Sequence, residues 1–218
     1  MATSVEQARA MSVQMNIMDR VAESTREVVI SSPYFVPGAE GVQAFAELRR
    51  RGVSVIILTN SLAANDVPVV HIGYARYRVP LLRSGVQLYE LSPSGVQRNE
   101  LSTLPTMSLG RLHAKAAVID GNMVYIGSMN LDPRSESTNT ELGIVARCPE
   151  LAREVSSVID ASRLQSSYEL RFGPDGNSLQ WLLMGAKPEV LLSSEPEVTP
   201  FVEFRNMLLA PFVPEQLL

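Results

Sequence analysis

Four residues in one short stretch of the chain carry the functional groups needed to hold a phosphodiester. The stretch HAKAAVIDGNMVYIGSMNLD, residues 113–132, contains His113, Lys115, Ser128 and Asn130. The lysine ammonium, the serine hydroxyl and the asparagine amide are donors for phosphate oxygens, and an imidazole can act as a nucleophile or as an acid. The residue types and their spacing therefore predict a phosphate site.

Two strands joined by a tight turn would bring these residues together. In a strand that begins near Leu112, His113 and Lys115 project from the same face, because alternate side chains of a strand point the same way. KAAVID and MVYIGS flank Gly121-Asn122, which predicts a hairpin. The second strand ends at the GSMN run, and we expect its hydroxyl and its amide to converge with Lys115.

The rest of the chain alternates helical and strand patterns. This alternation predicts one α/β domain over residues 1–218, with a mixed sheet between helix layers. Asp66 is a candidate cap for the third helix, which Pro80 should kink or split, and residues 92–111 have the composition of a polar loop. The helices are expected at residues 5–25, 40–52, 67–85 and 149–165, and the remaining strands at 26–35, 53–60, 86–91, 141–147, 168–172 and 179–183.

The composition excludes several kinds of site. Apolar residues make up 45% of the chain and charged residues 19%, which is typical of a globular protein. The net charge of −4 provides no overall attraction to nucleic acid or to an anionic membrane. One cysteine and two histidines cannot form a disulfide, a cysteine-based metal site or a multi-histidine metal site within one chain. The sequence contains no apolar run long enough to span a membrane and no signal-peptide pattern.

The run from His113 to Asn130 resembles the HKD signature of the phospholipase D superfamily. It reads His113-x-Lys115-x4-Asp120-x6-Gly127-Ser128-x-Asn130, which specifies six positions at fixed spacing. The segments SSPYFVPG, LTNSLAANDVPVVHIGYARYR, NTELGIV and LLAPFVPEQLL look like the C-terminal half of bacterial cardiolipin synthase-type members. The resemblance covers nearly the whole chain and implies a phospholipase D-like αβα half-domain.

The resemblance also implies a reaction and a role for each site residue. The reaction is transfer or hydrolysis of a phosphodiester through a covalent phosphohistidine, without a metal or a cofactor. His113 would protonate the leaving group and later activate the acceptor, while Lys115 and Asn130 would bind the non-bridging oxygens. Ser128 would donate to the phosphate or to the intermediate, and Glu141 would accept from the other nitrogen of His113 and orient the ring.

Three other residues have alternative interpretations. Asp120 belongs to the catalytic signature, but its position at a strand end beside a hairpin suits a scaffold role. Tyr34 could line the pocket or pack in the core. His71 could pack near the cleft or replace a missing catalytic histidine.

One HKD motif is half of the usual set. Members of the superfamily usually carry two motifs on two homologous halves, because one imidazole must be neutral to attack while another is protonated to expel the alkoxide. His71 has no lysine or aspartate at HKD spacing. We therefore expect the active site to require a second HKD half, either an upstream domain or a homodimer mate.

Three classes of function stay open on the sequence. The first is a phosphatidyltransferase or phospholipase half-domain of cardiolipin synthase type, with a phospholipid substrate, a cytoplasmic location and peripheral contact with the inner membrane. The second is a single-motif phosphodiesterase or nuclease that completes its site as a homodimer, although the acidic balance argues against nucleic acid. The third is a catalytically incomplete half-domain.

Overall fold

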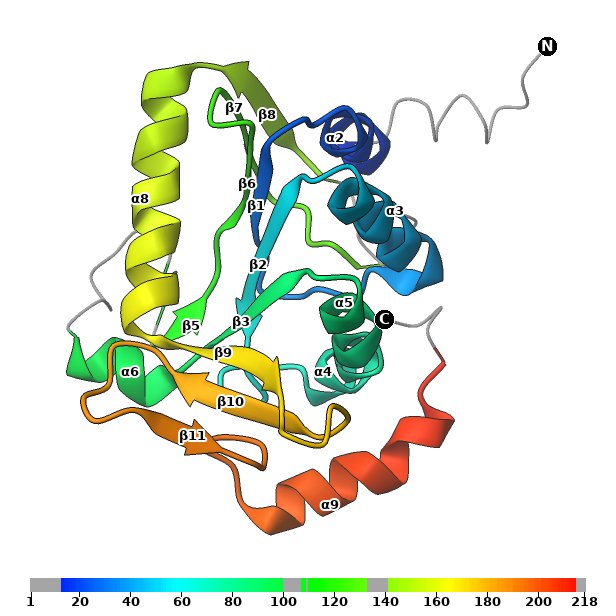
Figure 1. Ribbon diagram of the computed structural model, residues 1–218, viewed down its shortest axis with the longest axis vertical. Coiled ribbons are helices and arrows are strands. Elements are labelled where there is room, and N and C mark those ends of the chain that lie inside the picture. The colour runs from blue at the N-terminus through cyan, green and yellow to red at the C-terminus, as the bar shows by residue number, and fades with distance from the viewer. Residues whose placement is uncertain (1–12, 100–106, 109, 133–140, 215–218) are drawn as a thin grey trace.

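A nine-stranded mixed sheet forms the centre of the protein, with helices on both faces (Figure 1). The computed structural model describes residues 13–99, 107–108, 110–132 and 141–214. The strand order is β11-β10-β9-β3-β2-β1-β6-β7-β8. This arrangement confirms the predicted α/β fold with a mixed sheet between helix layers.

The three central strands are parallel to one another and the outer strands are antiparallel to their neighbours. The central strands are rich in Val, Ile and Leu and are buried on both faces, as expected for the parallel part of a sheet. They are β1 (Glu27–Ser31), β2 (Ser54–Asn60) and β3 (Gln87–Leu91). On one side follow β6 (Lys115–Ile119), β7 (Met123–Gly127) and β8 (Gly143–Arg147), and on the other β9 (Ser167–Phe172), β10 (Leu179–Leu183) and β11 (Val190–Leu192).

The helices form two layers around the sheet (Figure 1). One layer contains α2 (Val13–Ala22), α3 (Gly38–Arg50), α4 (Pro68–Ala75) and α5 (Arg78–Arg83), and the other contains α6 (Pro93–Arg98) and α8 (Pro149–Gln165). Each layer packs against its own apolar cluster on one face of the sheet. The chain continues through α9 (Pro200–Leu209) and the short 3-10 helix η2 (Ala210–Phe212). Of the helices in the described residues, none is long and apolar enough to cross a membrane.

The helix expected over residues 67–85 is split, and Asp66 does not cap it. α4 ends at Ala75 and α5 begins at Arg78, because the ring of Pro80 is incompatible with a helical hydrogen bond to the carbonyl four residues earlier. Val67 occupies the N-cap position and makes no side-chain cap. The carboxylate of Asp66 instead accepts a hydrogen bond from the Tyr34 hydroxyl (2.6 Å).

The segment 92–111 is more structured than the expected loop. It contains α6 and a small antiparallel pair, β4 (Met107–Ser108) and β5 (Arg111–Leu112). Ser92 caps α6 by accepting from the Gly95 amide (3.0 Å), a signal that the sequence contained in the run SPSG. Residues 100–106 and 109 lie outside the described residues, as do residues 5–12 of the first expected helix.

The predicted hairpin joins β6 to β7, but its turn is centred one residue earlier, on Asp120 and Gly121. Both have positive φ, of 53° and 64°, and the Asn122 amide donates to the Ile119 carbonyl (3.1 Å). This is the type I′ geometry that matches the twist of antiparallel strands. The Asp-Gly pair is therefore the turn signal.

The Asp120 carboxylate ties this hairpin to the start of β1. It accepts from the amides of Arg26 (2.8 Å), Thr25 (3.0 Å) and Glu27 (3.1 Å) and from the Thr25 hydroxyl (3.1 Å). Partial burial raises the pKa of the Asp120 carboxyl, but the amides of Glu27, Arg26 and Thr25 outweigh burial and hold the pKa below its ordinary value.

A buried charge cluster connects α4 and α5 with the strands β3 and β10. Arg78 donates from Nε to Glu90 (2.7 Å), and the Trp181 indole N–H donates to the other oxygen of Glu90 (3.0 Å). Arg78 also binds Glu195 and Nε2 of His71. Burial lowers the pKa of Arg78, but Glu90 and Glu195 outweigh burial and raise it well above its ordinary value. Arg78 is therefore held as a cation among these carboxylates, and the ring of His71 is one of its contacts.

We expect Glu90→Gln to destabilise the protein by about 3 kcal/mol, because Arg78 would then lack one of its carboxylate partners in a buried position. Denaturant unfolding followed by circular dichroism measures the change. The matched control is Glu47→Gln, which breaks a surface pair with Arg50 and should cost under about 0.5 kcal/mol. Equal effects of the two substitutions would contradict the structural role of the buried cluster.

We expect Asp120→Asn to destabilise the protein by about 1 kcal/mol at pH 7, with an effect that disappears in acid. A carboxyl with a lowered folded-state pKa contributes stability above its unfolded pKa of about 3.9, and this contribution is lost as the pH falls through the folded-state pKa. Asparagine also tolerates positive φ, so the turn itself is preserved. Unfolding free energies from pH 7 down to pH 2 measure the effect, with exposed Asp19→Asn as the control. A difference that persists unchanged at pH 2 would contradict this explanation.

Candidate active site

The candidate site lies at the carboxyl ends of the central parallel strands. β6 runs antiparallel to β1, with Ala116 opposite Ser31, so Lys115 lies beside the end of β1. Lys115 also pairs with Gly127 at the end of β7, and Gly127 pairs with Gly143 at the start of β8. The polar residues that follow or precede these strand ends are therefore gathered at one edge of the sheet, where ligands of open α/β sheets usually bind.

His113 and Lys115 share one cavity of about 150 Å³. Tyr34, Asn60 and Asp66 are also part of its wall. His113 is exposed and Lys115 is half-buried. The structure thus brings the first two residues of the predicted set together and adds three polar residues from the ends of β1 and β2.

The strand expected to begin near Leu112 begins instead at Lys115. β5 ends at Leu112, and His113 and Ala114 lie between β5 and β6 without strand pairing. The Lys115 ammonium donates to the carbonyl of His113 (2.8 Å). The two side chains therefore line one cavity although His113 lies before β6 and only Lys115 belongs to that strand.

Asn60 fixes the backbone immediately before His113. Its side chain is buried, accepts from the Leu112 amide (2.9 Å) and donates to the Leu112 carbonyl (3.3 Å). With these two bonds the side-chain amide of Asn60, the last residue of β2, pairs with the backbone of Leu112 as a neighbouring strand would. Asn60 thus positions the imidazole of His113 from the end of the central sheet.

Lys115 is surrounded by negative charge. Burial lowers the pKa of its ammonium below the ordinary value, and the carboxylates of Glu141, Asp132 and Asp66 offset part of that shift. A half-buried ammonium beside three carboxylates remains a cation at neutral pH and can bind a non-bridging phosphate oxygen.

Ser128 and Glu141 form a hydrogen-bonded pair next to Lys115. The Ser128 hydroxyl donates to the Glu141 carboxylate and accepts from the Leu142 amide (3.0 Å), and the Ser128 amide donates to the Leu142 carbonyl (2.9 Å). The sequence predicted His113 as the partner of Glu141. The structure shows the Ser128 hydroxyl as a partner of Glu141, and the pairing of Glu141 with His113 stays a prediction.

The ring of Tyr125 explains the two glycines of this edge. A Cβ atom on Gly127 or on Gly143 would collide with the Tyr125 side chain, which is buried across both positions. An aromatic side chain that covers glycines of its own strand and of the next strand compensates for their missing side chains. The row Lys115–Gly127–Gly143 is thereby held in register.

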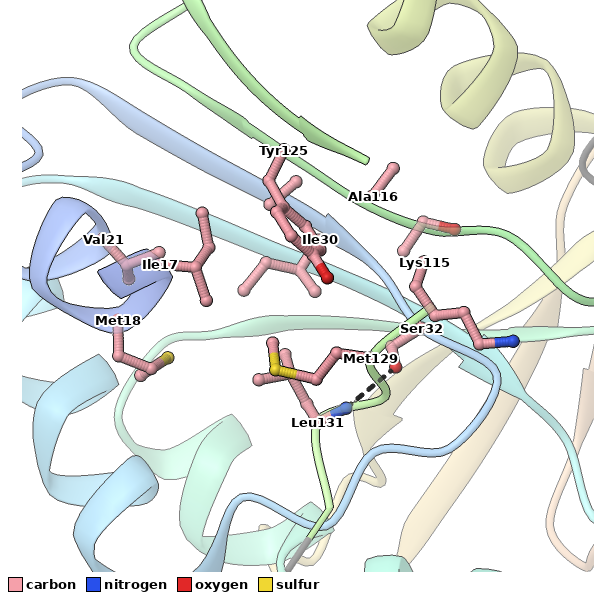
Figure 2. Close-up of a pocket in the computed structure, with 12 residues that line it drawn as sticks. Ile17, Met18, Val21, Ile30, Ser32, Lys115, Ala116, Tyr125, Met129 and Leu131 are labelled. Carbon is pink, nitrogen blue, oxygen red and sulfur yellow. Dashed lines mark hydrogen bonds between the residues drawn. The ribbon is translucent and has the colours of Figure 1, made fainter. Parts of the chain in front are cut away.

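The segment that carries Asn130 is anchored to the end of β1. The Leu131 amide donates to the Ser32 hydroxyl (3.2 Å), and the Val36 amide donates to the Leu131 carbonyl (2.6 Å). Asn130 is half-buried next to this anchor, two residues beyond Ser128. Figure 2 shows the apolar crevice between α2 and the sheet beside this anchor. The amine of Lys115 points away from the apolar side chains of that crevice.

Asp120 is not part of this site. It lies at the opposite end of β6 from Lys115, where it binds the start of β1. His71 is also separate, because its Nε2 faces the guanidinium of Arg78 in the buried charge cluster. Among the described residues, no group of three or more His, Cys, Asp or Glu side chains is placed to hold a metal ion.

Asn60 and Asp66 are site residues that the sequence reasoning did not assign. Both were visible as polar residues at or just after the end of a buried strand, in the run LTNSLAAND. Because the carboxyl ends of parallel strands meet at one edge, this position was a usable signal. Tyr34, for which the sequence left a core role and a pocket role open, lines the cavity.

Comparisons with known proteins relate this chain to one family. Residues 17–162 match the family described as cardiolipin synthase, PLD-like domain. The chain is 41% identical over 207 residues to cardiolipin synthase C of Escherichia coli (strain K12), covering 93% of this chain and 43% of that protein. It is 31% identical over 133 residues to cardiolipin synthase B of Salmonella typhi, covering 61% and 28%. The chain therefore spans less than half the length of these relatives.

Solved structures share the fold at low sequence identity. Nuc of Salmonella typhimurium, a phospholipase D family member, superposes with a TM-score of 0.53 at 18% identity, covering 74% of this chain and 92% of that chain. Phosphatidylserine synthase of Haemophilus influenzae superposes with a TM-score of 0.56 at 15% identity, covering 94% and 45%. Because the family match extends over more than half of its length, the chain belongs to the cardiolipin synthase family of phospholipase D-like domains.

Proposed function

We propose that this chain supplies one half of an active site that transfers or hydrolyses phosphodiesters of phospholipids, as a cardiolipin synthase-type phosphatidyltransferase. The observation that carries this proposal is the shared cavity of His113 and Lys115 at the carboxyl edge of the sheet. The family membership adds to it, since cardiolipin synthases are among the relatives that this chain matches.

The proposed reaction has two steps and needs two imidazoles. A neutral imidazole of the second half attacks phosphorus, the bond from phosphorus to the leaving oxygen breaks, and protonated His113 gives its proton to that oxygen. An acceptor hydroxyl then gives its proton to the now neutral His113 and attacks phosphorus, and the phosphorus–nitrogen bond breaks. A lipid alcohol as acceptor produces transfer, and water produces hydrolysis.

The other site residues act on charge and orientation in this proposal. Lys115 and Asn130 bind the non-bridging oxygens, where negative charge develops. Ser128 donates either to Glu141, as in the structure, or to a bound phosphate. Glu141 then becomes available to the imidazole of His113 when Ser128 turns to the substrate. Asp120 acts as a scaffold that holds the far end of β6.

An apolar surface next to the site supports docking of the second half. β8 ends the sheet, and the side chains of Leu142, Ile144 and Ile126 are exposed beside Ser128 and Glu141. Exposed apolar clusters of this kind usually mark protein interfaces. The second half, an upstream domain or another copy of this chain, would bring its imidazole to the open side of the cavity.

The outer face of α9 supports peripheral contact with a lipid surface. Phe201, Phe204 and Leu208 are exposed on it, whereas the polar Asn206 is buried on the inner face. A short helix with large apolar side chains facing outward suits the boundary between head groups and acyl chains. We therefore propose that the outer face of α9 contacts a lipid surface.

The chain on its own should have almost no phosphodiester turnover, because it supplies one motif and the reaction needs two imidazoles in opposite protonation states. Activity should appear when a second HKD half is added, and His113→Ala in this chain should reduce it by at least about 10³-fold. A lipid head-group release assay, run beside size-exclusion chromatography with light scattering, measures turnover and mass together.

The outcomes of this experiment separate the alternatives. Turnover that appears only in a dimer of this chain would identify a symmetric site with two copies of His113. Turnover that requires a different half would identify a two-domain enzyme. Robust His113-dependent turnover by a strictly monomeric species would exclude the half-site proposal.

In the complete enzyme, Asn60→Ala should lower kcat about 10-fold to 100-fold with little change in KM, because the backbone before His113 loses its anchor while the phosphate ligands stay in place. Asn60→Asp keeps the acceptor for the Leu112 amide and should restore part of kcat. Asn122→Ala, at the opposite end of β6, is the control and should be neutral. An unchanged kcat for Asn60→Ala would remove Asn60 from the positioning of His113.

A further inference from the structure

A second cavity lies between α4 and α9, outside the candidate active site. Its volume is about 330 Å³, which is room for roughly ten water-sized groups and lies at the lower end of the range for small-molecule sites. Figure 1 shows α9 lying beneath α4, and the two helices are in contact. The wall is mostly apolar, with Leu62 and Ile72 on one side and Met207 on the other. A cavity of this size with mostly apolar walls suits a small organic ligand.

Hydrogen bonds attach the end of α9 to the residue that follows α4, so the two walls of this cavity are held together. Arg76 follows α4 and lines the cavity. Its guanidinium donates to the carbonyl of Ala210 and to the carbonyl of Val213 (2.7 Å). These two bonds hold α9 at the distance from α4 that leaves the cavity open.

Two buried donors in the wall lack partners in the described part of the chain. His71 and Asn206 both line the cavity and are more than nine-tenths buried. The His71 Nδ1 and the Asn206 Nδ2 have no hydrogen-bond partner. Arg78 can only donate, so the His71 Nε2 that faces it must accept, and the ring proton is then on Nδ1. Unpaired buried donors of this kind usually find an acceptor on a ligand or a water.

The charges of the wall favour a neutral ligand with oxygen atoms. Arg76 is positive and Glu203 is negative, and the carboxylate of Glu195 is already paired with Arg78. The wall therefore offers N–H donors, carboxylate acceptors and apolar surface without a strong net charge. A hydroxyl group can use donors and acceptors at once, and a short alkyl chain can cover the apolar side.

We propose that the α4–α9 cavity binds the glycerol and the first part of the acyl chain of an acylglycerol. Its hydroxyl and ester oxygens take the N–H groups of His71 and Asn206, and the alkyl carbons lie along Ile72 and Met207. The cavity lies on the inner side of α9, the helix whose outer face we assign to the lipid surface. An acylglycerol therefore has a short path to it. This site is distinct from the His113 cavity and has no role in its chemistry.

The test uses monooctanoylglycerol below its critical micelle concentration, with glycerol alone and 1-octanol alone as the two partial probes. The chain contains two histidines, so protein labelled with ¹⁵N-histidine shows only two imidazoles, and His113→Gln assigns them. We expect His71 as the Nδ1–H tautomer, with a saturable shift of its Nδ1 signal on addition of monooctanoylglycerol. Each partial probe should bind at least ten-fold more weakly. No shift, or equal binding of a partial probe, would overturn the proposal.

Matched substitutions locate the bound probe. Ala75→Leu adds bulk to the cavity wall at a residue outside the charge cluster and should weaken binding of the probe at least ten-fold. Ala39→Leu adds the same side chain at an exposed position of α3 and should leave binding unchanged. Phe204→Ser on the outer face of α9 should also leave it unchanged. Loss of binding in Phe204→Ser with normal binding in Ala75→Leu would place the probe on the outer face and overturn the proposal. The measurement involves no phosphodiester, so its result is independent of the proposed reaction.

Discussion

The antiparallel pairing of β6 with β1 places the start of one strand beside the end of the other, and the position of each candidate catalytic group depends on it. Ala116 lies opposite Ser31, so Lys115 reaches the carboxyl edge of the parallel strands. A shift by one residue would turn Lys115 to the other face of the sheet. The register is held at one end by Asp120 and at the other by the Tyr125 ring that covers Gly127 and Gly143.

The charges around Lys115 bear on the proposal that a second half completes the site. Lys115 and Arg111 are cations that line the cavity, while Glu141, Asp132 and Asp66 all act on Lys115 with negative charge. A phosphate entering this half alone would meet these two cations and also several carboxylates, which weaken its binding. A second half that adds a lysine and an imidazole would change this balance, and closure would remove water and strengthen the attraction of both lysines for the phosphate.

The two histidines have different surroundings and therefore different uses. His113 is exposed in a chain bend and is free to meet a substrate and a second half. His71 is fixed between Arg78 and Tyr74 in the buried charge cluster, where the Arg78 guanidinium engages its Nε2. The cluster joins the core of the sheet to the α4–α9 cavity, so the same ion pairs that stabilise the fold orient the His71 N–H.

The sequence by itself determined the class of fold and the family, because the alternation of helical and strand patterns and the HKD spacing are local patterns. The chemistry of His113 and Lys115 stays a prediction. The sequence also revealed that Pro80 would divide a helix, since that effect depends on one residue and the carbonyl four positions earlier. Only the tertiary structure decided that Asn60 anchors the residue before His113, that Asp66 faces Tyr34 instead of capping α4, and that Glu141 binds Ser128. These contacts join residues 13 to 52 positions apart, and their partners are chosen by the order and register of strands, which no local pattern specifies.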